Sequence, residues 1–155
     1  VQMQRDNGGF ALWDKNGSEE YWLTAYVMDF LVRANEQGYS VPVEVINRGN
    51  ERLLRYLQDP GMLSIRYTDD SSASRFAVQA YAALVLAHQQ KAPLGALREI
   101  WERRAQAASG LPLLQLGIAL KNMGDANRSE QALTLALNTP RYATVDGGLR
   151  QCVTG

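Results

Sequence analysis

Cysteine and histidine are nearly absent from this chain of 155 residues, which has one of each, Cys152 and His88. A disulfide framework needs paired cysteines and a Cys/His zinc site needs several ligands, so we exclude the first and almost any form of the second. A basic excess is also missing, because 16 Lys and Arg balance 16 Asp and Glu. Nucleic acids and anionic membranes attract basic proteins, so neither is expected as the main partner.

Long apolar runs are missing as well: none reaches the roughly 18 residues that span a bilayer, and we find no signal peptide. What is present is a globular composition, with 46% hydrophobic and 21% charged residues. Such a chain can bury one core and is not disordered. The sequence begins with Val1 rather than with methionine, so we expect the chain to be a segment of a longer protein.

The apolar residues recur with a helical period over most of the chain, which predicts an all-α fold. Ser18 is the expected N-cap of the first helix, and Gly38 is expected to end it. Residues 1–17 and 141–155 show no such period, so we predict one partial domain over 1–155, helical over 19–137, with irregular ends. The six expected helices are 19–37, 42–58, 71–90, 93–108, 111–123 and 125–137.

Apolar and amphipathic helices alternate along the chain. The first, third and fifth are apolar almost all round and should be buried all round, whereas the second, fourth and sixth have one charged face. This alternation predicts helical hairpins in two layers, as in about half of an α/α toroid. A weak internal repeat agrees, since Ala25-Tyr26 recurs as Ala80-Tyr81 about 55 residues later.

Few residues are candidates for chemistry, and each has an ordinary structural interpretation. His88 is expected to lie half-exposed at a helix C-terminus, and Asp29 to cap a helix or pair with an arginine. Asp69-Asp70 precedes a helix as a capping segment would, and Cys152 lies near the chain end with little cationic shelter. We therefore predict no catalytic, cofactor or metal site, and no enzyme.

Two stretches resemble a known family. Both are similar to the thioester domain of the alpha-2-macroglobulin family, and the whole chain is most similar to its bacterial branch. The stretches are Gln4-Arg5-Asp6-Asn7-Gly8-Gly9-Phe10-Ala11-Leu12-Trp13 and Tyr21-Trp22-Leu23-Thr24-Ala25-Tyr26-Val27-Met28-Asp29-Phe30-Leu31. The first stretch also resembles the glutamine–aromatic turn of terpenoid cyclases, which share the toroid.

The resemblance implies a six-hairpin toroid in the parent protein, of which three hairpins are present here. It also implies that the parent is a periplasmic lipoprotein, anchored to the bacterial inner membrane, that traps peptidases of a host or competitor. In the family, cleavage of a bait region exposes a Cys–Gln thioester that captures the peptidase. Expected partners are thus peptidases and other domains of the parent.

The thioester motif itself, Cys-Xaa-Glu-Gln, is absent, since Cys152-Val153-Thr154-Gly155 lacks both the Glu and the Gln. We therefore expect a soluble scaffold fragment of the domain without covalent chemistry. A half-ring also leaves apolar flanks open, so the isolated chain is expected to be marginally stable, or to cover these flanks by self-association or with its own tail.

Two alternatives remain open. A tetratricopeptide-like binding module is one, although only a single unit of that pattern is present. An enzyme on the same toroid, a terpenoid cyclase or prenyltransferase, is the other, although it would need an acidic motif or zinc ligands. The residues that match the tetratricopeptide pattern are Leu116, Gly117, Leu120, Gly124, Asp125, Leu133, Ala136, Leu137 and Pro140.

Overall fold

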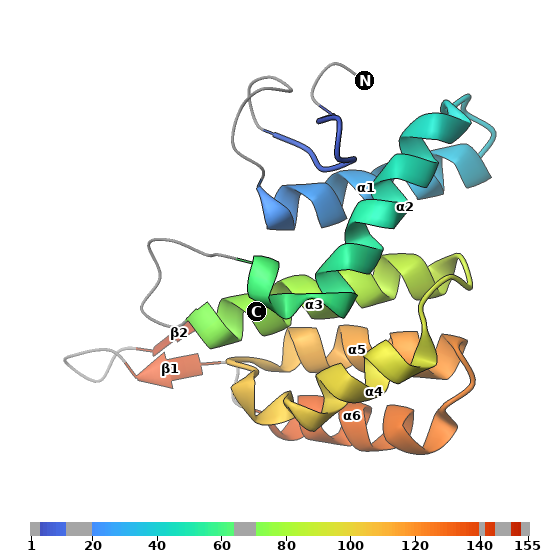
Figure 1. The fold of residues 1–155 in the computed structure, drawn as a ribbon. Helices are drawn as coiled ribbons and strands as arrows, with labels where there is room; N and C mark the ends of the chain where they lie inside the picture. Colours follow the sequence, from blue (N-terminus) through green and yellow to red (C-terminus); the bar gives the residue numbers. More distant parts are fainter. Residues whose placement is uncertain (1–3, 12–19, 64–70, 140–141, 145–149, 153–155) are drawn as a thin grey trace. The chain divides into compact units, whose positions relative to one another are not determined.

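The computed structural model describes residues 4–11, 20–63, 71–139, 142–144 and 150–152, and these confirm the all-α fold class (Figure 1). The chain divides into two compact units, residues 1–63 and 64–155, which are treated in turn. The expected single partial domain stays a prediction. The helices are α1 (Tyr21–Glu36), α2 (Val43–Gln58), α3 (Ser71–His88), α4 (Leu94–Glu102), α5 (Gly110–Asn122) and α6 (Ala126–Asn138).

The fourth helix is shorter than predicted. Instead of extending to residue 108, α4 ends at Glu102 and is followed by a 3₁₀ turn, Arg104–Gln106. The Arg104 guanidinium donates a hydrogen bond to the Trp101 carbonyl oxygen at 3.1 Å. A side chain thereby takes the carbonyl that the N–H of residue 105 would use in a continuing α-helix.

The irregular C-terminal segment expected from the sequence is wrong in part. Two short strands, β1 (Tyr142–Thr144) and β2 (Arg150–Cys152), pair in antiparallel register, with Ala143 opposite Gln151. The helical period could not reveal strands of three residues each.

In the N-terminal unit, α1 and α2 form a hairpin with a close approach at Gly49. A Cβ atom on Gly49 would lie 2.0 Å from Met28 Sδ, so only glycine leaves room for this methionine. In the same unit, the rings of Tyr21 and Tyr56 meet edge to face, with centroids 5.4 Å apart. The residues buried on α1 are Thr24, Ala25, Met28 and Val32.

Burial of α1 on all sides, as expected from its composition, is wrong. Trp22, Tyr26 and Phe30 lie one turn apart along one side of the helix and are 54%, 59% and 65% exposed. Within its unit α1 packs against α2 and the N-terminal turn, which cover only part of its circumference. We call these three residues the aromatic stripe.

In the C-terminal unit, α5 packs against both α3 and α6. The α5–α6 contact is close because Gly110 faces the Ala136 carbonyl oxygen, which a Cβ would approach to 2.5 Å. Ser129 Oγ donates to the buried Gly117 carbonyl oxygen at 2.7 Å and joins the same two helices. Burial all round is wrong for α5 too, because Leu111, Leu114 and Ile118 are exposed on one side; α3, by contrast, has nine buried residues.

The repeat of about 55 residues is visible in the burial pattern. The four positions that α1 buries correspond, 55 residues later, to four positions that α3 also buries. The two helices therefore present equivalent sides to their own units, which the weak sequence match alone did not establish. The corresponding pairs are Thr24 and Gln79, Ala25 and Ala80, Met28 and Ala83, and Val32 and Ala87.

The three apolar helices also end in one kind of turn. Gly38, Gln90 and Gly124 follow α1, α3 and α5 with positive φ angles of 95°, 61° and 94°. Each donates its N–H to the carbonyl three positions earlier, and the next N–H donates to the carbonyl five positions earlier. This is the Schellman arrangement, which satisfies carbonyls that a helix end leaves unpaired. Gly38 thus ends the first helix as predicted.

Candidate functional site

The N-terminal turn is held by polar contacts of a buried glutamine. Gln4 Nε2 donates to the Gly8 carbonyl oxygen at 3.2 Å and to the Val45 carbonyl oxygen at 3.0 Å. The Phe10 N–H donates to Thr24 Oγ1 at 2.9 Å, and the Phe10 side chain is buried. These bonds join the turn to both helices of its unit, so the residues that suggested a family motif have a structural role here.

Gly8 allows the turn to approach α2. Its φ angle is +92°, and a Cβ at this position would lie 2.1 Å from the Arg48 carbonyl oxygen. An L side chain would be strained at that angle and would collide with backbone, which cannot move aside cheaply. The glycine is therefore required for both the conformation and the contact.

The candidate acid Asp29 pairs with an arginine, as the structural interpretation predicted. Asp29 Oδ1 lies 2.7 Å from Arg33 Nε, one turn along α1. His88 is the last residue of α3 and is exposed, which also agrees with the prediction. Asp69, Asp70 and Ser18 lie outside the described residues, and of Cys152 the structure describes only the backbone in β2.

Asp125 is a buried acidic group held by two arginines, and from the sequence it was named only in the tetratricopeptide pattern and as the first residue of the sixth helix. Its side chain is 6% exposed, and its Oδ2 lies 3.0 Å from both Arg98 Nε and Arg128 Nη1. Burial alone would raise the pKa of Asp125. The hydrogen bond from the Arg128 N–H and the two guanidinium groups outweigh burial, so the pKa lies below its ordinary value.

This cluster connects α4 to the start of α6. Asp125 is the N-cap of α6, where its Oδ1 accepts the hydrogen bond from the Arg128 N–H at 3.1 Å. The aspartate N-cap position before a helix was a detectable signal in the sequence. The pairing with Arg98, 27 residues earlier, had no such signal, and the geometry indicates a structural tie rather than a reactive acid.

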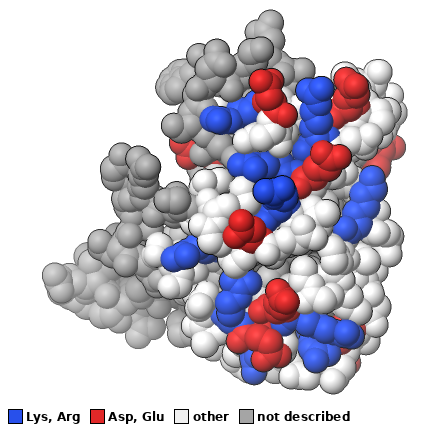
Figure 2. Space-filling view, viewed as in Figure 1, with Lys and Arg blue, Asp and Glu red and all other residues white. Residues whose placement is uncertain are grey.

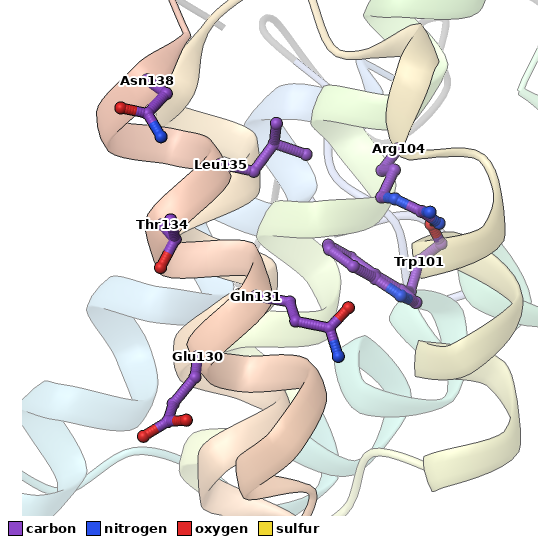
Figure 3. A pocket seen from close by; sticks show the side chains of 7 residues that line it. All are labelled: Trp101, Arg104, Glu130, Gln131, Thr134, Leu135 and Asn138. Carbon is purple, nitrogen blue, oxygen red and sulfur yellow. The ribbon is translucent and has the colours of Figure 1, made fainter.

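An open pocket of about 490 Å³ lies between α6 and the end of α4 (Figure 3). In it, the Arg104 guanidinium carbon lies 4.4 Å from the Trp101 ring centroid, a cation–π distance. This pocket could not be anticipated from the sequence, because it depends on how the end of α4 and α6 lie relative to each other in the tertiary structure. The lining residues are Trp101, Arg104, Glu130, Gln131, Thr134, Leu135 and Asn138.

Charge is evenly mixed over the described part of the face that Figure 2 shows, where Lys and Arg alternate with Asp and Glu. Among the described residues, no group of three or more His, Cys, Asp or Glu side chains could hold a metal ion. A search of the described helices for one long and apolar enough to cross a membrane finds none.

Comparison with known sequences finds similar proteins of one kind, although no protein-family profile matches the chain. The chain is 82% identical over 141 residues to alpha-2-macroglobulin of Escherichia coli strain K12, and 38% identical over 149 residues to alpha-2-macroglobulin of Xylella fastidiosa strain Temecula1. The matches cover 91% and 96% of this chain. They cover 8% and 9% of the relatives, so the chain spans less than a tenth of their length.

Comparison with solved structures gives the same result. The cryo-EM structure of native E. coli alpha-2-macroglobulin matches with a TM-score of 0.90 and 78% identity, over 96% of this chain and 9% of that one. Salmonella alpha-2-macroglobulin reacted with methylamine matches with a TM-score of 0.89 and 77% identity, over 95% and 9%. These likenesses confirm the family resemblance that rested on residues 4–13 and 21–31.

Proposed function

Since this chain belongs to the bacterial alpha-2-macroglobulin family, we propose that it is a scaffold segment of the thioester domain of a periplasmic peptidase inhibitor. In this proposal the chain contributes about half of an α/α toroid and no covalent chemistry. The parent, anchored to the inner membrane, binds peptidases through its other parts. In support, alpha-2-macroglobulin structures similar to this chain include forms activated by trypsin and by porcine elastase.

The observation behind the scaffold role is that three of the buried polar residues, Gln4, Thr24 and Asp125, hold separate elements of the fold together. Gln4 and Thr24 fasten the N-terminal turn, and Asp125 fastens α4 to α6. A catalytic acid or base would instead be directed at a site where a substrate can bind. The exposed aromatic stripe supports a further part of the proposal, that the separated segment associates with itself.

A chemical test separates a scaffold segment from one that contains a thioester. Methylamine cleaves a thioester by aminolysis, so the purified chain is incubated with methylamine and its intact mass is measured. We expect no mass change, and full alkylation of Cys152 by iodoacetamide without methylamine treatment. The positive control is Salmonella alpha-2-macroglobulin, a protein that has been reacted with methylamine. A methylamine adduct on this chain would refute the proposal.

The peptidase and membrane parts of the proposal are tested on the full-length parent protein. The parent should form a covalent complex with trypsin that survives denaturing electrophoresis, whereas this chain alone should form none. After cell fractionation, the parent should be found with the inner membrane and be digested by protease added to spheroplasts. A parent released with the cytoplasm would contradict the assigned location.

A further inference from the structure

Two side chains, one before helix α4 and one within it, bind the same corner of the C-terminal unit. This α5–α6 corner consists of residues 122–125, the turn from α5 to α6. Gln90, four residues before α4, donates from Nε2 to the Asn122 carbonyl oxygen at 3.0 Å. Arg98, within α4, has its Nε 3.0 Å from Asp125 Oδ2. In Figure 1 the connection that precedes α4 and the turn between α5 and α6 lie at the same end of the unit.

The turn at Gln90 is conformationally unfavourable without its side-chain contact. Gln90 has a φ angle of +61°, where the equivalent turns after α1 and α5 have glycine. The left-handed conformation costs free energy for a residue that has a Cβ atom. The hydrogen bond to the Asn122 carbonyl oxygen offsets part of this cost. The path from α3 into α4 therefore depends on the position of the end of α5, whereas the two glycine turns are stable by themselves.

Helix α4 has little stability of its own. It has nine residues, fewer than the roughly 12–15 that an isolated helix needs, and no side chain caps its N-terminus at Pro93. It packs against α3 and α5, and its buried residues are Leu97, Ile100 and Trp101, compared with nine in α3. Its attachment therefore depends on this small apolar contact together with the two contacts at the α5–α6 corner.

From these observations we propose that α4 is a strap that opens as one unit, and that Gln90 and Arg98 keep it closed by binding the α5–α6 corner. Opening separates both side chains from the corner and uncovers the apolar surface beneath α4. The other helices of the unit stay packed, because the close approach at Gly110 and the hydrogen bond from Ser129 to Gly117 join α5 to α6 without α4. The proposal involves neither a thioester nor self-association, so it is judged separately from the methylamine result.

Native-state hydrogen exchange of the ¹⁵N-labelled full chain measures this opening. The amides of residues 97–102 report on α4, and those of residues 116–120 report on α5. A helix that opens locally exchanges through a state that is more populated than the opening of its neighbours. In the wild-type chain we expect the opening equilibrium constant to be at least about tenfold larger for α4 than for α5.

Two substitutions of Gln90 separate the hydrogen bond from the backbone conformation. Gln90→Ala removes the bond and keeps the unfavourable φ angle, so the opening constant of α4 should rise about fivefold. Gln90→Gly removes the same bond but fits the left-handed conformation, so the constant should stay within about twofold of wild type. The matched control is Gln89→Ala, since Gln89 Nε2 donates to the Val85 carbonyl oxygen within α3. It should change the opening of α4 less than about twofold.

A second pair of variants tests the ion pair. Arg98→Gln should raise the opening constant of α4 about tenfold, because a charge-assisted hydrogen bond to Asp125 is lost. Arg128→Gln removes the other arginine from the same aspartate, but this arginine lies on α6, so α4 should open less than about twofold more. Combining Gln90→Ala with Arg98→Gln should multiply the two effects, to about fiftyfold, if both contacts oppose one opening. Circular dichroism checks that each variant keeps its helices.

Three outcomes would overturn the proposal. Amides of α4 and α5 that exchange through the same opening in the wild-type chain would show one cooperative unit without a strap, and this comparison depends on no variant. Equal effects of Gln90→Ala and Gln90→Gly would refute the role of the left-handed turn. Equal effects of Arg98→Gln and Arg128→Gln on α4 would refute the role of the Arg98 contact.

Discussion

Helices α1 and α3 have similar compositions and yet different surroundings. Both are apolar around most of their circumference, but α3 has nine buried residues, whereas α1 has four and an exposed aromatic stripe. Helix α3 packs against α5 and α4 in its unit, and α1 packs against α2 and the N-terminal turn. The number of packing partners, and not apolar composition alone, therefore decides how much of such a helix is buried.

The two units also use polar residues differently. In the N-terminal unit a glutamine and a threonine fasten a turn through neutral hydrogen bonds to backbone. In the C-terminal unit a buried aspartate joins two helices through two arginines. A charged cluster responds to pH and a neutral one does not, so the two units can be distinguished in solution.

The largest expected effect contrasts one phenylalanine from each apolar helix. Phe76→Ala in α3 should lower the free energy of unfolding by about 3–5 kcal/mol, because it empties space in a fully buried site. Phe30→Ala in α1 should change it by less than about 0.5 kcal/mol, because that ring is already exposed. Urea unfolding followed by circular dichroism measures both. Equal losses would show that the apolar composition of the helix, rather than its packing, determines how much a phenylalanine contributes to the free energy of unfolding.

A second contrast uses glycines. Gly8→Ala should lower the free energy of unfolding by about 2–4 kcal/mol, because the new Cβ meets the Arg48 carbonyl and the positive φ angle disfavours alanine. Gly95→Ala is the control in α4, where a Cβ meets nothing within 4 Å. It should be neutral or stabilise by up to about 1 kcal/mol, because alanine favours helix. If Gly8→Ala left the free energy of unfolding unchanged, this would contradict the close contact between the N-terminal turn and α2.

A third contrast compares the two aspartates. At pH 7, Asp125→Asn should cost about 1–2 kcal/mol, because hydrogen bonds to two guanidinium groups lose their charge. The pKa of Asp125 is lowered by folding, so its stabilisation is present above the ordinary value of 3.8 and is lost as the pH falls through the folded value. The difference from wild type should therefore disappear in acid.

Asp29→Asn is the control for that measurement. Its ion pair with Arg33 is between neighbouring turns of one helix, and the arginine is largely exposed. The substitution should cost no more than about 0.5 kcal/mol at pH 7. Unfolding midpoints measured from pH 7 to pH 2.5 compare the two variants, and a pH-independent effect of Asp125→Asn would contradict the assigned ion pairs.

The smallest effect on folding, but a visible one on association, is expected at the aromatic stripe. Replacing Tyr26 and Phe30 with serine should leave the unfolding midpoint nearly unchanged, because both side chains are exposed. The apparent mass from light scattering should fall toward that of a monomer at high protein concentration. The matched control is Tyr39→Ser, an exposed tyrosine in the connection after α1. If the wild-type chain is already a monomer at high protein concentration, this would contradict the proposal that the aromatic stripe mediates self-association.

Much of the fold could be predicted because it depends on local signals. Helical period, Pro42 before α2 and glycines after α1 and α5 gave six helices with nearly correct bounds. The early end of α4 could not be predicted, because the alanine-rich residues 105–108 favour helix, and the hydrogen bond from the Arg104 side chain to the Trp101 carbonyl oxygen has no signal in the sequence. The exposed side of α1 was missed because the composition of a helix does not indicate how many other elements pack against it.

The candidate sites divide in the same way. The pairing of Asp29 with an arginine one turn away follows from helical spacing and was anticipated. The Asp125 cluster and the Trp101–Arg104 pocket join residues about 27 to 37 positions apart, and their pairing depends on how α4 lies against α6. Periodicity gives the side of each helix that faces inward, but not which residues meet across it.

The common turn after α1, α3 and α5 has a consequence for how such a chain can vary. These helices have 16, 18 and 13 residues, yet each ends in the same hydrogen-bonded stop. One residue in the left-handed conformation thus sets the direction in which the backbone leaves each helix, whatever the length of that helix. A change in the length of one of these helices can therefore leave the direction of the following chain unchanged, provided that the left-handed residue and its two hydrogen bonds are kept.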